Sequence, residues 1–241
     1  MITDELALLY PGYAAEDDYP RLAAMMSPPV SFRVIHTSLG DSGDAHTVEA
    51  LRDMGAAQRL ADGVASLSST TASVVWACTS GSFVYGWQGA HQQVEELADV
   101  SGLPASSASL AFAHALDSMK LRRVAVAATY PEDVTKFFVQ FLRDGGFEVV
   151  SASVADVMTA TSAGQLGDDV VTAMVCGVDY SDAEAILVPD TALHTIAVLA
   201  KLELAVGKPV LTANQVCAWE AMRLAGIKGH ADAGRLFARR S

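Results

Sequence analysis

The sequence is poor in cysteine. Its 241 residues contain three, Cys78, Cys176 and Cys217, which are far apart and form no CxxC pair. An odd number of widely spaced cysteines argues against a disulfide framework and against a cysteine-based zinc site. We therefore expect free thiols in a reducing compartment, with the cytoplasm as the location, and no metal site.

Basic segments and long apolar runs are also missing. The 16 lysines and arginines stand against 28 aspartates and glutamates, which gives a formal net charge of −12. Nucleic acids and anionic membranes both require a basic surface, so we expect neither as a partner. No apolar run approaches the roughly 20 residues of a membrane span. The N-terminal segment MITDELALLYPGY is acidic and does not resemble a signal peptide. An acidic chain can still bind a small anion through backbone N–H groups.

Short runs rich in valine, isoleucine and leucine alternate with longer helical patterns along the chain. Most runs are unbroken rather than alternating in polarity, which is typical of parallel strands covered on both faces. This alternation predicts an α/β fold with mainly parallel, doubly wound sheets. The predicted strands are residues 6–11, 31–39, 73–78, 122–130, 147–154, 185–190 and 208–214.

Stop signals define two of the predicted helices. Residues 132–146 carry an apolar face and end at a Gly-Gly pair. Residues 191–207 end at Gly207, with a proline shortly beyond. We therefore predict a helix over each of these segments.

The chain also divides into two similar halves. Cys78 closes one buried strand and Asp190 closes another, and a helical pattern follows each. Because open parallel sheets bind ligands at the carboxyl ends of their strands, two facing lobes would bring both side chains into one cleft. We predict two pseudo-symmetric Rossmann-like lobes packed as one unit. The first comprises residues 1–110 and 208–241, and the second comprises residues 111–207.

The segment VVWACTSGSFVYG, residues 74–86, carries the first candidate site. Its apolar run ends at Cys78 and is followed by small hydroxyl residues and a glycine. Turn N–H groups and a helix N-terminus at this point favour an anion and would lower the pKa of the cysteine. A structural role is the alternative, because a cysteine that ends a core strand is usually a packing residue. Asp190 has a similar alternative as a helix N-cap.

Several separate motifs resemble the Asp/Glu racemase superfamily, and most closely its maleate cis–trans isomerases and arylmalonate decarboxylases. These motifs are ACTSGSFVYG, VAVAATYPEDV, ILVPDTALHT, GKPVLTANQVCAWEAMRLAG and AGRLF. The resemblance covers nearly the whole chain in order. It implies a two-lobed, pseudo-symmetric α/β fold and cofactor-independent chemistry at a carbon next to a carboxylate. In members with two cysteines, one thiol from each lobe flanks the substrate carbon.

The resemblance implies Cys78 and Asp190 as catalytic residues. Cys78 matches the first-lobe cysteine, and Asp190 lies where the second cysteine is expected, which argues against two-thiol racemisation. The segment YPGYAAEDDYP lacks the asparagine that maleate isomerases carry after the first strand, which argues against maleate as the substrate. The expected substrate-binding residues are Thr79, Ser80, Tyr130, Thr191 and Asn214.

Other chemically distinctive residues are expected to be structural. Buried positions are usual for unpaired cysteines, so Cys176 and Cys217 are predicted to fill core space. The acids Glu16, Asp17 and Asp18 are predicted to form a solvated loop near the cleft.

The sequence leaves three functions open. The first is an isomerase, of the cis–trans isomerase or racemase type, acting next to the carboxylate of a small mono- or dicarboxylic acid. Cys78 would be its thiolate nucleophile or base, and Asp190 the opposite acid if its surroundings keep it protonated. The second is a decarboxylase of a substituted malonate, where one proton donor is enough. The third is a carboxylate-binding protein without catalysis. We expect a small carboxylate ligand, no cofactor and a homo-oligomer.

Overall fold

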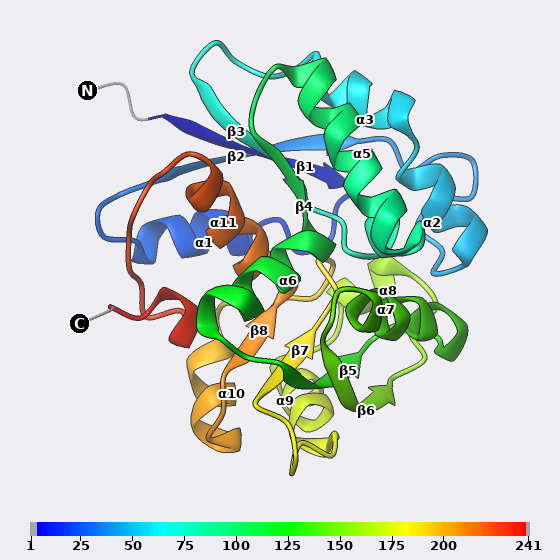
Figure 1. The fold of residues 1–241 in the computed structure, drawn as a ribbon, viewed down its shortest axis with the longest axis vertical. Helices are drawn as coiled ribbons and strands as arrows, with labels where there is room; N and C mark the ends of the chain where they lie inside the picture. Colours follow the sequence, from blue (N-terminus) through cyan, green and yellow to red (C-terminus); the bar gives the residue numbers. More distant parts are fainter. Residues whose placement is uncertain (1–3, 240–241) are drawn as a thin grey trace.

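The computed structural model describes residues 4–239 and contains two four-stranded sheets (Figure 1). The strand order is β2-β1-β3-β4 in the first sheet and β6-β5-β7-β8 in the second. All strand pairings in both sheets are parallel. Counted from its own first strand, the second sheet repeats the order of the first. The predicted α/β fold with two similar lobes and parallel sheets is therefore confirmed.

Each predicted apolar run contains a strand. The first sheet consists of β1 (Glu5–Pro11), β2 (Ser31–Thr37), β3 (Thr71–Trp76) and β4 (Ala105–Ser107). The second consists of β5 (Arg123–Ala128), β6 (Glu148–Val154), β7 (Ala185–Val188) and β8 (Val210–Thr212). The apolar pattern misses β4 because this strand is only Ala-Ser-Ser.

Helices cover both faces of the first sheet. Successive residues of a strand point to opposite sides, so one strand contributes to two cores. Leu6 and Leu8 of β1 pack in the core that includes α1 and α11. Ala7 and Leu9 pack in the core that includes α2, α3 and α5. The helices are α1 (Asp18–Met25), α2 (Val48–Met54), α3 (Ala57–Val64), α4 (Ser80–Phe83), α5 (Gly86–Ser101), α6 (Ala108–Met119), α7 (Glu132–Asp144), α8 (Ala160–Gly164), α9 (Asp168–Gly177), α10 (Leu199–Val206) and α11 (Ala213–Leu224), with a short 3₁₀ turn at Arg235–Phe237.

The predicted helix over residues 191–207 is wrong in its first half. Residues 191–198 form turns, and α10 begins only at Leu199. Asp18 provides the physical reason: its Oδ2 accepts hydrogen bonds from the backbone N–H groups of Thr195 (2.9 Å) and Ile196 (3.3 Å). Asp18 itself is 1% exposed, so its predicted place in a solvated loop is also wrong.

The C-terminal segment contributes to both lobes. Residues 208–241 are predicted for the first lobe, but β8 pairs with β7 in the second sheet. Helix α11, which follows directly, contacts β1, β3 and α6 (Figure 1). Strand β8 therefore belongs to the second sheet, whereas α11 packs on the first.

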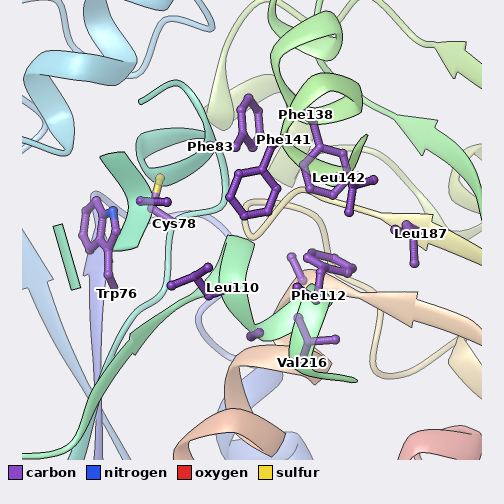
Figure 2. Close-up of a cluster of buried hydrophobic side chains, with 14 of the residues drawn as sticks. Trp76, Cys78, Phe83, Leu110, Phe112, Phe138, Phe141, Leu142, Leu187 and Val216 are labelled. Carbon is purple, nitrogen blue, oxygen red and sulfur yellow. The ribbon is translucent and has the colours of Figure 1, made fainter. Parts of the chain in front are cut away.

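One hydrophobic cluster contains residues of both lobes. Trp76 and Phe83 belong to it from the first lobe, and Phe138 and Leu187 from the second (Figure 2). Cys78 is part of the same cluster. Within residues 4–239, no helix has the length and apolar character needed to cross a membrane.

Candidate active site

Cys78 and Asp190 occupy equivalent positions in the two lobes. Strand β3 ends at Trp76 and strand β7 at Val188, so each candidate lies two residues beyond its strand. The direction in which successive strands are added to the sheet reverses between β1 and β3 in the first sheet, and between β5 and β7 in the second. Open α/β sheets bind ligands at such a reversal, outside the carboxyl ends of the strands.

The two side chains line one cavity of about 20 Å³. A space of this size holds about one water molecule. Ser80 and Thr191, two of the predicted binding residues, also line it. Much of the remaining wall is apolar and includes Leu39, Leu51 and Met54. In the part of the chain that the structure describes, no three His, Cys, Asp or Glu side chains are arranged to hold a metal ion.

Cys78 is buried, with 4% of its surface exposed. Its Sγ accepts a hydrogen bond from the Gly81 N–H at 3.3 Å and lies 3.8 Å from the Ser80 hydroxyl. Burial raises the pKa of Cys78 to about 11; these two contacts oppose the rise, and the charge of Asp190 adds to it. The predicted lowering of this pKa is therefore wrong. Helix α4 has only four residues, and its N-terminus does not offset the loss of water.

The carboxyl group of Asp190 accepts hydrogen bonds at both oxygens. Oδ1 accepts from the Ala192 N–H at 2.9 Å, and Oδ2 accepts from the hydroxyl of Thr129. Both carboxyl oxygens of Asp190 therefore act as acceptors in this arrangement. The Ala192 contact closes a local turn and does not cap α10, which begins further along the chain.

Two other predicted binding residues lie behind the cavity wall. Tyr130 donates its hydroxyl hydrogen to the Pro189 carbonyl at 2.6 Å, and its ring contacts Phe83. Burial raises the pKa of Tyr130 well above its usual value. Thr79 is fully buried, and its hydroxyl has no hydrogen-bond partner within the described chain.

Asn214, the last predicted substrate-binding residue, lies outside the cavity, and its side chain bonds to other residues of the chain. Its Nδ2 donates to Asp18 Oδ2 at 3.2 Å, and its Oδ1 accepts from the Tyr19 hydroxyl at 3.0 Å. Asn214 is 1% exposed and does not line the cavity. It joins α1 to the start of α11, which is a structural role.

Comparison with known proteins places this chain in a family. The family model of arylmalonate decarboxylase matches residues 15–237. The chain belongs to the arylmalonate decarboxylase family. It is 29% identical over 146 residues to an arylmalonate decarboxylase of Bordetella bronchiseptica, covering 58% of this chain and 60% of that protein. It is 27% identical over 132 residues to a maleate isomerase of Pseudomonas putida, covering 52% and 53%. The aligned segments therefore span little more than half of each curated relative.

Solved structures of the arylmalonate decarboxylase and maleate isomerase types share the fold over nearly the whole chain. A Pseudomonas putida maleate isomerase superposes with a TM-score of 0.87 at 16% identity, covering 98% of both chains. A double mutant of arylmalonate decarboxylase in its liganded form gives 0.83 at 22% identity, also covering 98% of both. A mutant Nocardia farcinica maleate cis–trans isomerase with a covalently bound succinylcysteine intermediate gives 0.87 at 19% identity, covering 99% of this chain and all 100% of that one.

This member of the arylmalonate decarboxylase family has two polar cavity residues that the sequence patterns do not reveal, Tyr10 and His46. Tyr10 lies near the carboxyl end of β1 and donates its hydroxyl hydrogen to the Thr191 carbonyl at 2.9 Å. The strand-end rule that points to Cys78 also applies to Tyr10. His46 lies in the loop between β2 and α2, where no sequence pattern marks it.

The other two cysteines of this family member lie outside the cavity. Cys217 is buried on α11, as predicted. Cys176 is exposed near the end of α9, so its predicted core position is wrong. Only Cys78 among the three lines the cavity.

Proposed function

We propose that the chain is a cofactor-independent isomerase, of the cis–trans isomerase or racemase type, for small mono- or dicarboxylic acids. It would act at the carbon next to a carboxylate. The observation that carries the proposal is that one reactive side chain from each lobe, Cys78 and Asp190, lines a single cavity. An inversion at carbon needs groups that act on opposite faces, whereas decarboxylation needs one proton donor.

In the racemase form of the reaction, Asp190 is the first base and Cys78 the first acid. The Asp190 carboxylate removes the proton from the carbon next to the substrate carboxylate, and the electron pair of the broken carbon–hydrogen bond forms an enediolate. The Cys78 thiol, which is protonated at neutral pH because burial raises its pKa to about 11, then delivers its proton to the opposite face of the carbon. The hydroxyl groups of Ser80 and Thr191 are the proposed donors to the negative charge that develops on the carboxylate oxygens.

In the cis–trans form of the reaction, the Cys78 thiol passes its proton to Asp190 as its sulfur bonds to one carbon of the double bond of an unsaturated acid. The π electron pair moves into the carboxylate next to the other carbon and forms an enediolate. Rotation then follows about the resulting carbon–carbon single bond, and elimination of the sulfur, which takes its proton back from Asp190, restores the double bond. A relative of this fold carries a succinylcysteine intermediate in its crystal structure, which supports thiol addition as chemistry for this site.

Deuterium exchange tests the proposal on many acids at once, so the substrate need not be identified first. Wild-type protein is incubated in heavy water with a panel of unsaturated and α-substituted mono- and dicarboxylic acids, and NMR detects deuterium at carbon and any change of configuration. We expect turnover of at least one acid and a loss of roughly 10²–10⁴-fold in both Cys78→Ser and Asp190→Asn, since each removes a proton-transfer group. The control is Cys217→Ser, a buried cysteine outside the cavity, which should retain activity.

Decarboxylation of a substituted malonate is the second candidate function. It is favoured by the match to the arylmalonate decarboxylase family model over residues 15–237. The protonated Cys78 thiol is also a suitable donor to the enediolate that remains when carbon dioxide leaves. Stoichiometric release of carbon dioxide, with no exchange into unreacted substrate, would replace the isomerase proposal by this one. Binding of acids with neither exchange nor release would leave a carboxylate-binding protein.

A further inference from the structure

His46 is a buried histidine of the cavity wall that the proposed chemistry does not use. It is 4% exposed and lies in the loop between β2 and α2. Its Nδ1 is 2.7 Å from the carbonyl oxygen of Val157. A carbonyl oxygen only accepts, so Nδ1 carries the hydrogen, and the neutral ring presents the lone pair of Nε2.

The ring is held in place from both lobes. The backbone N–H of His46 donates to the Met158 carbonyl at 2.8 Å, and Ala45 forms an isolated antiparallel bridge with Thr159. The Thr161 N–H donates to the Asp44 carboxylate at 2.8 Å. The imidazole therefore sits on backbone that is fixed across the lobe boundary, which suits it to hold a ligand in a defined position.

Nε2 of His46 is the nitrogen available to a ligand. It has no hydrogen-bond partner within residues 4–239, and His46 lines the same cavity as Cys78 and Asp190. No lysine or arginine of the described chain lines this cavity, so His46 is its sole potential cation. The charges near the ring are negative: Asp44 interacts with it electrostatically, and Asp190 shares the cavity. Tyr130 contacts the ring as a neutral phenol, with ring centres 4.9 Å apart.

We propose that His46 is a specificity-determining residue whose Nε2 binds an acidic group of the substrate, away from the carboxylate held beside Cys78. The proposal rests on the proposed function of this cavity as a carboxylate site. A second proton on the ring gives a charge-assisted hydrogen bond to that group, which is strong in a cavity with little water. A substrate with an apolar substituent in place of this acidic group gains no binding affinity from the imidazole.

A matched pair of probes isolates this interaction. Maleate and isocrotonate differ only in that a methyl group of isocrotonate replaces one carboxylate of maleate. Their dissociation constants are measured by calorimetry in a Cys78→Ser background, which prevents turnover. His46→Gln is expected to weaken maleate binding by roughly 10–100-fold, as expected for loss of a hydrogen bond to a charged group. The dissociation constant of isocrotonate should change less than a few-fold.

His36 supplies the matched control. Its Nδ1 also lies against a backbone carbonyl, that of Gly12 at 2.6 Å, but its side chain is outside the cavity. His36→Gln should leave both dissociation constants unchanged. An equal loss for both probes in His46→Gln would mean damage to the cavity and would overturn the specificity role.

The ring nitrogens give a signature that a structural role does not. In ¹⁵N spectra the His46 ring should carry its hydrogen on Nδ1 in the free protein and gain a second, on Nε2, when maleate binds. Unchanged ring signals, or no maleate binding at millimolar concentration, would overturn the proposal. Deuterium exchange into monocarboxylic acids with no maleate signature would leave the isomerase standing and remove His46. The ¹⁵N change on maleate binding, without turnover of any acid, would support the role of His46 and overturn the isomerase proposal.

Discussion

Burial determines the charge on Cys78, the candidate nucleophile. Cys78 is almost fully buried, and loss of water raises its pKa to about 11 despite the hydrogen bond from the Gly81 N–H and the contact with the Ser80 hydroxyl. Asp190 is also buried, and each of its carboxyl oxygens accepts a hydrogen bond. In the proposed racemase reaction, a neutral thiol therefore acts opposite the carboxylate that takes up the substrate proton.

Alkylation kinetics test the state of the Cys78 thiol. The thiolate is the reactive form, so with a pKa of about 11 the reaction of Cys78 with iodoacetamide should rise about tenfold per pH unit from pH 7 towards that value. The exposed Cys176 should react first at neutral pH. Peptide mapping by mass spectrometry separates the three cysteines, and Cys217, which is also buried, is the internal control. Rapid and pH-independent labelling of Cys78 would contradict the raised pKa.

The positions of the site residues are easier to predict from the sequence than their protonation states. Cys78 and Asp190 follow apolar strands, and the ends of parallel strands are where such folds bind ligands. Protonation depends on how far the packed lobes exclude water, which no local pattern contains. His46 lies in a loop that reaches the cavity only through its contacts with Val157 and Met158 of the other lobe. The sequence predicts that Asn214 binds substrate, and no local pattern shows that its side chain contacts Asp18 and Tyr19, which are distant in sequence.

At the scale of elements, Asp18 at the start of α1 connects three segments. Its Oδ2 accepts from the N–H groups of Thr195 and Ile196 and from the side chain of Asn214 on α11. These bonds hold residues 191–198 in turns beside the cavity residue Thr191. The apolar pattern and the Gly207 stop signal predicted a helix through this segment, because neither contains information about a carboxylate from the N-terminal region. Strand positions were predicted well because apolar runs depend mainly on local composition.

Replacement of Asp18 should therefore destabilise the protein more than replacement of a residue in a solvated loop, which is where the sequence places Asp18. Asp18→Ala leaves buried N–H groups without an acceptor, and we expect a loss of roughly 2–4 kcal/mol in the free energy of unfolding by urea. The neighbouring Asp17→Ala is the control. Asp17 is exposed and pairs with Arg21 and His194 at the surface, so its loss should be within about 0.5 kcal/mol. Equal effects of the two variants would show that the Asp18 network does not stabilise the fold.

For the molecule as a whole, the repeated strand order creates two lobes, but the packing joins them. Strand β8 completes the second sheet and helix α11 then covers the first, so one continuous segment belongs to both. Helix α5 of the first lobe contacts α7 of the second, where Trp87 lies 5.0 Å from Phe141 between ring centres. The sequence repeat revealed that there were two halves. It could not assign the C-terminal segment, because strand partners are set by pairing across the chain.

The shared core predicts that both lobes unfold in one cooperative step. Native-state hydrogen exchange measures this directly, because the slowest amides of each sheet report the opening free energy of that sheet. Amides of β1 and β3 should give the same free energy as those of β5 and β7, since one hydrophobic cluster contains residues of all four strands. Leu60→Ala, in α3 of the first lobe, removes a buried side chain and should lower this free energy by roughly 2–5 kcal/mol. The decrease should be equal in both sheets. A decrease confined to β1 and β3 would mean that the lobes unfold independently, and that the cavity between them can open without disrupting either lobe.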